Sequence, residues 1–118
     1  MKPEYLARIV PTLFWLALAF TMVMALLPKP AALPVEVGDK VQHLLAFAAL
    51  SLLACLAFPR RRLIELFAAM AALGALIELL QMIPVLHRDA QFMDWVADCG
   101  ASLVVLLLCQ GGRWLITR

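Results

Sequence analysis

Long apolar runs alternate with short polar segments along the chain. Four runs, at about residues 9–27, 41–58, 63–83 and 92–109, are rich in Leu and Ala. Each is close to the roughly 20 residues that an α-helix needs to cross a bilayer. Membrane β-strands would instead show alternating segments of about 10 residues. The pattern therefore predicts an all-α fold, an integral membrane four-helix bundle that forms a single domain over residues 1–118.

Helix-breaking residues separate the four runs. Three prolines fall between the first two runs, Pro59 ends the second run, and Pro84 ends the third. Gly111 and Gly112 follow the fourth run, which we expect to end near residue 109. The first run is longer than the roughly 7–15 apolar residues of a signal peptide, so we interpret it as an uncleaved span.

Composition supports the membrane assignment. The chain is 65% hydrophobic and 15% charged, with a mean hydropathy of +0.96. Soluble domains are about 45–50% apolar and about 25% charged. These values exclude a disordered chain and argue against a small soluble domain, which could not bury so much apolar surface. The net charge of +2 gives no reason to expect nucleic acid as a partner.

The basic residues predict an orientation. With four spans, seven Lys and Arg residues fall at the two termini and in the second connection, and three fall in the first and third connections. Because basic residues mark the cytoplasmic side, we expect both termini to be cytoplasmic. Trp114 would then lie at the inner membrane interface and Trp95 at the outer one, as in aromatic belts.

Polar residues on three predicted helices are spaced so that they gather near the outer face. The pairs are Asp39 and His43, Glu78 and Gln81, and Asp94 and Asp98, with Ser102 continuing the last. Residues three or four apart share a helix face, and polar stripes in membrane helices face the bundle interior or a water-filled cavity. We therefore predict an outer-leaflet binding pocket that also includes Lys40 and Arg88. We expect His43, Glu78, Arg88 and Asp94 to converge.

Structural roles are open for several of these residues. Asp39 and Asp94 are also suited to cap the starts of their helices, where the helix dipole favours a negative charge. His43 would also be satisfied at the membrane interface. Glu78 is harder to explain structurally, because it lies towards a helix C-terminus, where the dipole disfavours a carboxylate. It needs a proton or a partner, for which Arg88 and His43 are the candidates.

Local spacing favours neither a metal site nor disulfides. No pair of candidate ligands has a metal-binding spacing such as HExxH, so we expect no metal and no cofactor. Cys55, Cys99 and Cys109 are odd in number, dispersed, and lie within predicted spans. We expect them to be small apolar packing residues rather than a disulfide framework.

Three motifs resemble those of the VanZ-like membrane protein family. Residues 38–47 (GDKVQHLLAF) are similar to its DK-x-x-H-x-x-AF motif, and residues 78–81 (ELLQ) to its E-x-x-Q. Arg88, Asp94, Asp98 and Gly100 resemble its R…D-x-x-x-[ND]-x-x-G segment, with Asp98 at the position where Asn is usual. The resemblance implies a multi-pass protein of the bacterial cytoplasmic (inner) membrane. It also implies a link to the cell envelope, or to antibiotic resistance, since the family is named for low-level resistance to teicoplanin, a lipoglycopeptide.

Three functions follow from these expectations. The first is binding of membrane lipids, in particular a lipid-linked cell-wall precursor or a lipoglycopeptide, in the outer pocket. The second is an intramembrane enzyme in which His43 acts as acid or base with Glu78 or Asp94. The third is a small transporter, which ranks last because the acidic cluster lies near one face and not at the midplane. Whether the protein is an enzyme or an oligomer stays open.

Overall fold

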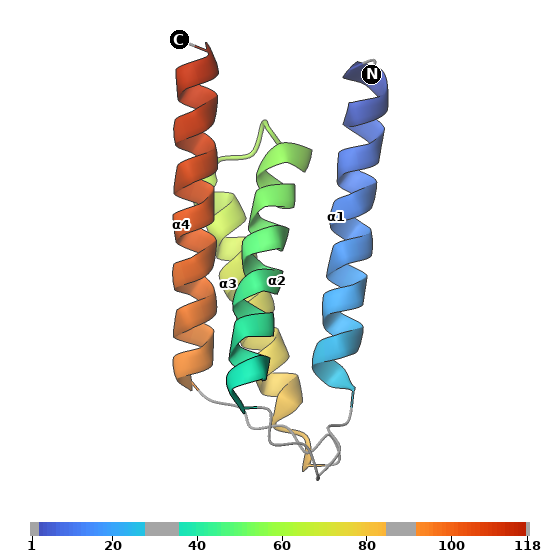
Figure 1. Cartoon of the computed structure of the whole chain (residues 1–118), viewed down its shortest axis with the longest axis vertical. Coiled ribbons are helices and arrows are strands. Elements are labelled where there is room, and N and C mark those ends of the chain that lie inside the picture. The colour runs from blue at the N-terminus through green and yellow to red at the C-terminus, as the bar shows by residue number, and fades with distance from the viewer. Residues whose placement is uncertain (1–2, 28–35, 85–91, 118) are drawn as a thin grey trace.

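The structure is a four-helix bundle. It is a computed structural model that describes residues 3–27, 36–84 and 92–117, and leaves aside the side chains of 3, 6, 36–40, 116 and 117. The helices run alternately in opposite directions, so the start of the first and the end of the last lie at the same end of the bundle (Figure 1). The all-α prediction is confirmed by four helices: α1 (Pro3–Leu26), α2 (Glu36–Ala57), α3 (Leu63–Gln81) and α4 (Phe92–Thr117).

The helices α2 and α4 are neighbours that run in the same direction, although α3 separates them along the chain (Figure 1). The helix α3 packs against α4 in the opposite direction, and α1 packs on α2 and α3. We call the end of the bundle that holds residues 26, 36, 81 and 92 the distal end. The opposite end, which holds residues 57, 63 and 117, is the terminal end. The starts of α2 and α4 therefore meet the last turn of α3 at the distal end.

Three helices, α1, α2 and α4, extend beyond the predicted spans. The prediction that the fourth span ends near residue 109 is wrong for the helix, because α4 continues through Gly111 and Gly112 to Thr117. Glycine costs about 1 kcal/mol in a helix interior relative to alanine but does not block the backbone hydrogen bonds. The helix α1 likewise contains Pro11. Membrane helices tolerate such a proline, because neighbouring groups and local adjustments satisfy the freed backbone.

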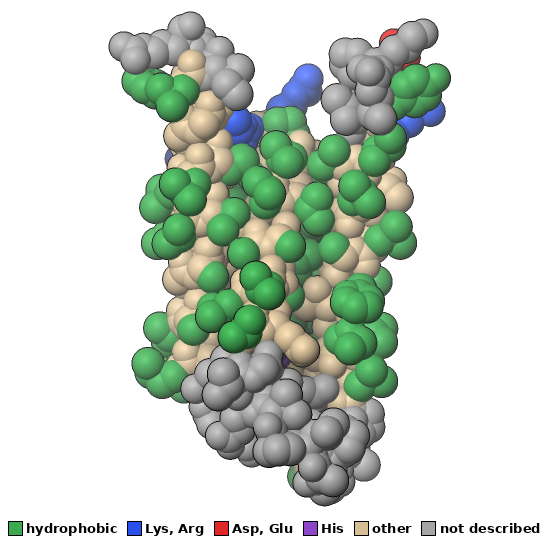
Figure 2. Space-filling view, in the orientation of Figure 1, with side chains coloured by type: hydrophobic (Ala, Val, Ile, Leu, Met, Phe, Trp, Pro, Cys, Tyr) green, Lys and Arg blue, Asp and Glu red, His purple; other side chains and the backbone are tan. Residues whose placement is uncertain are grey.

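The outer surface of the bundle is apolar. Leu108 is 71% exposed, Phe20 66% and Leu45 65%, and Figure 2 shows apolar side chains along the visible face of the helices. In the described residues, α1, α3 and α4 each contain a stretch long and apolar enough to cross a membrane, and α2 contains the shorter apolar stretch Val41–Ala57. An apolar surface of this extent indicates a membrane protein.

The core consists of two apolar groups along the bundle axis. Phe14, Leu50 and Leu106 belong to the larger group, and Phe47 and Ile77 to the smaller one. All five are at most 5% exposed. They lie on α1 to α4, so apolar contacts join all four helices independently of the polar residues.

Trp95 joins α3 to α4. Its indole Nε1 donates a hydrogen bond of 2.9 Å to the carbonyl of Ala71. The ring fits over Gly74, where an added Cβ would lie 3.1 Å from Trp95 Cδ1. This tryptophan therefore packs α4 against α3. The sequence had indicated only a position at the membrane interface. Trp114, by contrast, is 59% exposed near the end of α4.

The expectation that the cysteines are only packing residues is wrong for two of them. Cys55 of α2 and Cys109 of α4 form a disulfide, with their Cα atoms 6.7 Å apart. They are 54 residues apart in the chain, and the parallel packing of α2 and α4 brings them together. Sequence spacing could not show this pairing, because it depends on which helices are neighbours. Cys99 is a free cysteine.

Candidate functional site

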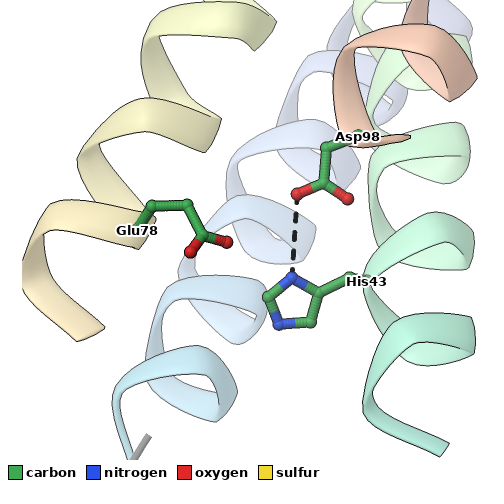
Figure 3. Close-up of side chains that lie close together, drawn as sticks. All are labelled: His43, Glu78 and Asp98. Carbon is green, nitrogen blue, oxygen red and sulfur yellow. Dashed lines mark ion pairs between the residues drawn. The ribbon is translucent and has the colours of Figure 1, made fainter. Parts of the chain in front are cut away.

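Three polar side chains from three helices meet near the distal end. His43 comes from α2, Glu78 from α3 and Asp98 from α4 (Figure 3). Each offers a nitrogen or carboxylate oxygen, and these atoms all lie within 4.8 Å of one another. Within the group, His43 Nδ1 lies 3.7 Å from Asp98 Oδ2. A direct N–H···O hydrogen bond would be about 2.7–3.2 Å, so the pair is close but not hydrogen-bonded.

Helix direction and side-chain spacing produce this meeting. His43 and Asp98 lie in the second turns of the parallel helices α2 and α4, and Glu78 lies in the last turn of the antiparallel α3. His43 is four residues before the core residue Phe47, so both project from one face of α2. Glu78 is four residues after the buried Gly74 and three before the buried Gln81, so it shares their face of α3. The same periodicity that builds the core therefore turns these polar groups inward.

The site is withdrawn from the outer surface. The side chain of Asp98 is 3% exposed and that of His43 is 19% exposed. The described arginines belong to the first turns of α1, the connection between α2 and α3, and the end of α4, all at the terminal end, where Figure 2 shows the basic side chains. Among apolar neighbours, a carboxylate strongly favours a proton, a positive partner or a cation.

A cavity adjoins the histidine. It has a volume of about 460 Å³ and lies between α1, α2 and α3, with His43, Gln42 and Thr21 as its polar lining and Phe20 and Leu45 among its apolar lining. The last two side chains are 66% and 65% exposed, so the cavity opens on the outer surface of the bundle. A molecule lying along that surface can reach the imidazole through the cavity.

The structure separates the predicted site residues into three groups. His43 and Glu78 come together as expected, but the carboxylate beside them is that of Asp98. Asp94, one turn earlier on α4, is not part of the close group. Gln81 is 3% exposed, and its Nε2 donates a 2.9 Å hydrogen bond to the carbonyl of Ala25, which ties α3 to α1. The side chains of Asp39, Lys40 and Arg88 lie outside the described residues.

Two hydroxyl groups were not selected from the sequence. They are Thr21, which lines the cavity, and Ser51, which is fully buried on α2. Ser102, which the sequence had indicated, is likewise fully buried on α4. Within the described part of the chain, neither serine Oγ makes a hydrogen bond. Ser51 is eight residues after His43 and so lies on the same helix face, a signal that the sequence contained. Thr21 stands in an otherwise apolar run, and its spacing indicated no site.

The terminal end also carries polar contacts between α2 and α4. Arg113 Nη2 donates a hydrogen bond to the carbonyl of Pro59, and Nη1 is 3.5 Å from the carbonyl oxygen and 3.1 Å from Sγ of Cys55. The last carbonyls of a helix lack partners within the helix and interact favourably with a cation. These contacts use the charge of Arg113 to hold the end of α2, next to the disulfide.

Comparisons with known protein families, with curated proteins and with solved structures find no match to this chain. The site is therefore interpreted from its own geometry: an acidic, histidine-containing group inside an apolar bundle, beside a cavity that opens on the outer surface.

Proposed function

We propose that the protein binds the polar head of an amphipathic, lipid-like molecule at the distal end of the bundle. The observation that carries this proposal is the position of the cavity, which joins His43 to a surface formed by apolar side chains such as Phe20 and Leu45. In a membrane, lipid chains lie along that surface. An acyl chain fits the apolar wall, and the head group then reaches the buried polar residues.

The chemistry of the site favours a particular class of head group. Glu78 and Asp98 accept hydrogen bonds or pair with a positive charge, and His43 donates or accepts according to its protonation. Amines and sugar hydroxyls satisfy such a group. Lipid-linked cell-wall precursors and lipoglycopeptides carry these groups on an apolar anchor, so they belong to the proposed class of ligands.

The resemblance to VanZ-like proteins supports the same proposal. His43, Glu78 and Asp98 each come from a different one of the three motifs that carry the resemblance, and these are the residues that meet. We accordingly propose a multi-pass protein of the bacterial cytoplasmic membrane, with its termini inside and this site in the outer leaflet. The basic side chains at the terminal end support that orientation (Figure 2).

Lipid co-purification tests the proposal. The purified protein is analysed by native mass spectrometry, and the masses that remain bound are identified. Ala46 lines the cavity, whereas Ala49 lies one turn later on α2 and is exposed. We expect Ala46→Trp to fill the cavity and remove the bound lipid, and Ala49→Trp to retain it. We expect Glu78→Gln to change which head groups are retained. If all variants keep the lipids of the wild type, the proposal is wrong.

Acid–base catalysis is the second candidate function. One observation favours it: the imidazole of His43 lines the cavity and lies 3.7 Å from the Asp98 carboxylate. A carboxylate that orients a histidine is a common arrangement for a general base. We expect such an enzyme to convert a co-purified lipid during incubation in vesicles, and His43→Gln to stop the conversion. Unchanged lipid masses after incubation with the wild type would leave only the binding function.

A further inference from the structure

We propose that His43, Glu78 and Asp98 bind one divalent transition-metal ion, with Zn²⁺ as the representative. The proposal goes beyond head-group binding and rests on the three side chains alone. They supply one imidazole nitrogen and two carboxylate groups, a mixed donor set that suits Zn²⁺ and Mn²⁺ better than an all-oxygen ion such as Ca²⁺.

The distances are close to those of a coordination site. Two ligand atoms about 2.1 Å from Zn²⁺ at a tetrahedral angle lie roughly 3.4 Å apart. The 3.7 Å between His43 Nδ1 and Asp98 Oδ2 is nearer to this separation than to a hydrogen bond. The donor atoms of all three residues lie within 4.8 Å of one another. A side-chain movement of about 1 Å therefore suffices to place all three on one ion.

The charge and the burial of the three side chains also favour a bound cation. The side chain of Asp98 is 3% exposed, and His43 Nδ1 lies 3.7 Å from its carboxylate. A buried carboxylate is costly unless a positive group or a cation is paired with it. Two carboxylates and a neutral imidazole carry a net charge of −2, which one divalent ion cancels.

The cavity gives a bound ion access to a further molecule. Three protein ligands leave a fourth position open, which is the arrangement of catalytic rather than structural zinc sites. His43 lines the cavity, so an ion on its Nδ1 lies near the cavity and can accept an oxygen from a molecule inside it. The ligands come from three different helices. A motif with short spacing, such as HExxH, therefore could not indicate this site in the sequence.

Direct Zn²⁺ binding tests the proposal. The full chain, with an affinity tag that contains no histidine, is purified in detergent, stripped with a chelator and titrated with Zn²⁺ alone. Calorimetry gives the affinity, and metal analysis after desalting gives the stoichiometry. We expect one equivalent per chain, with release of protons as the ligands are deprotonated. We expect His43→Gln, Glu78→Gln and Asp98→Asn each to weaken binding by about 100-fold.

Matched variants control for other sites. His87→Gln removes the other histidine of the sequence, Glu65→Gln removes an exposed acid on the same helix as Glu78, and Cys99→Ala removes the free thiol. We expect all three to bind as the wild type does. Circular dichroism checks that each variant is helical, and Zn²⁺ should raise the unfolding temperature of the wild type but not of Asp98→Asn.

Three outcomes would overturn the metal site: no stoichiometric binding by the wild type, binding that survives all three ligand substitutions, or equal loss in the control variants. Lipid co-purification repeated in chelator separates this failure from that of the proposed function. Lipid retained without Zn²⁺ binding leaves head-group binding intact and removes only the metal.

Discussion

The two ends of the bundle join the same pair of helices in different ways. At the terminal end, a disulfide links Cys55 to Cys109, and Arg113 donates hydrogen bonds to carbonyls near the end of α2. At the distal end, His43 and Asp98 face each other from the same two helices at 3.7 Å, beside a cavity. The terminal end is held by a disulfide and hydrogen bonds, and the distal end brings ionisable groups to within ion-pair distance of one another.

This difference separates stability from binding. Apolar contacts such as those of Leu50 and Leu106 already hold α2 against α4. The terminal end adds covalent and charge-assisted bonds to these contacts. The distal end adds groups that are costly to bury, which a fold selected for stability alone would lack. We therefore expect substitutions at the terminal end to lower stability, and substitutions at the distal end to change binding while leaving stability equal or higher.

The largest effect is expected from the disulfide. A bridge that closes a loop of 54 residues typically contributes about 2–4 kcal/mol to the free energy of unfolding. Cys55→Ala with Cys109→Ala should lose that amount, measured by denaturant titration of the micelle-bound protein. Cys99→Ala, which removes the free cysteine, should unfold as the wild type does. A reductant should lower the stability of the wild type but not of the double variant. Equal unfolding with and without reductant would show that the bridge does not stabilise the terminal end.

Arg113 should have the next largest effect. Arg113→Met keeps an apolar stem but leaves the carbonyls of Cys55 and Pro59 without its hydrogen bonds. We expect a loss of about 1–3 kcal/mol in the same titration. Arg62→Met is the matched control, because Arg62 lies in the connection between α2 and α3 at the same end of the bundle and is exposed. If both variants lose the same stability, the contacts of Arg113 are not what holds this end.

The smallest effect, of opposite sign, is expected at the distal end. Asp98→Asn removes a charge from a side chain that is 3% exposed, and His43 can lose its proton, so no unpaired histidine charge remains. We expect the metal-free variant to be about as stable as the wild type or more stable by about 1 kcal/mol. A loss of 2 kcal/mol or more would show that Asp98 stabilises the fold, and the contrast between the two ends would then disappear.

The fold was largely predictable because the apolar runs have the length of membrane-spanning helices. The runs located all four helices, and three- and four-residue spacing placed His43 and Glu78 on inward faces. Helix ends were less predictable. Gly111 and Gly112 lower helix propensity without preventing the helix, so composition placed the end of α4 too early.

The partner of each helix could not be predicted from spacing. Periodicity shows which residues share a face, but it does not show that α2 and α4 are parallel neighbours. For that reason Asp94 was expected beside His43 and Glu78, where the structure places Asp98 one turn later on the same stripe, and the pairing of Cys55 with Cys109 was missed. Both depend on how far α4 is displaced along α2, which side-chain packing decides.

The parallel arrangement of α2 and α4 also has a consequence for biosynthesis. A chain is made from its N-terminus, so α2 and α3 enter the membrane before α4 exists. His43 and Glu78 are then already in place, and Asp98 arrives with the last helix. The buried carboxylate of Asp98 therefore enters the membrane after the two residues that lie beside it. A nascent chain that stops before residue 92 lacks this carboxylate, so the site cannot be complete before the last helix is made.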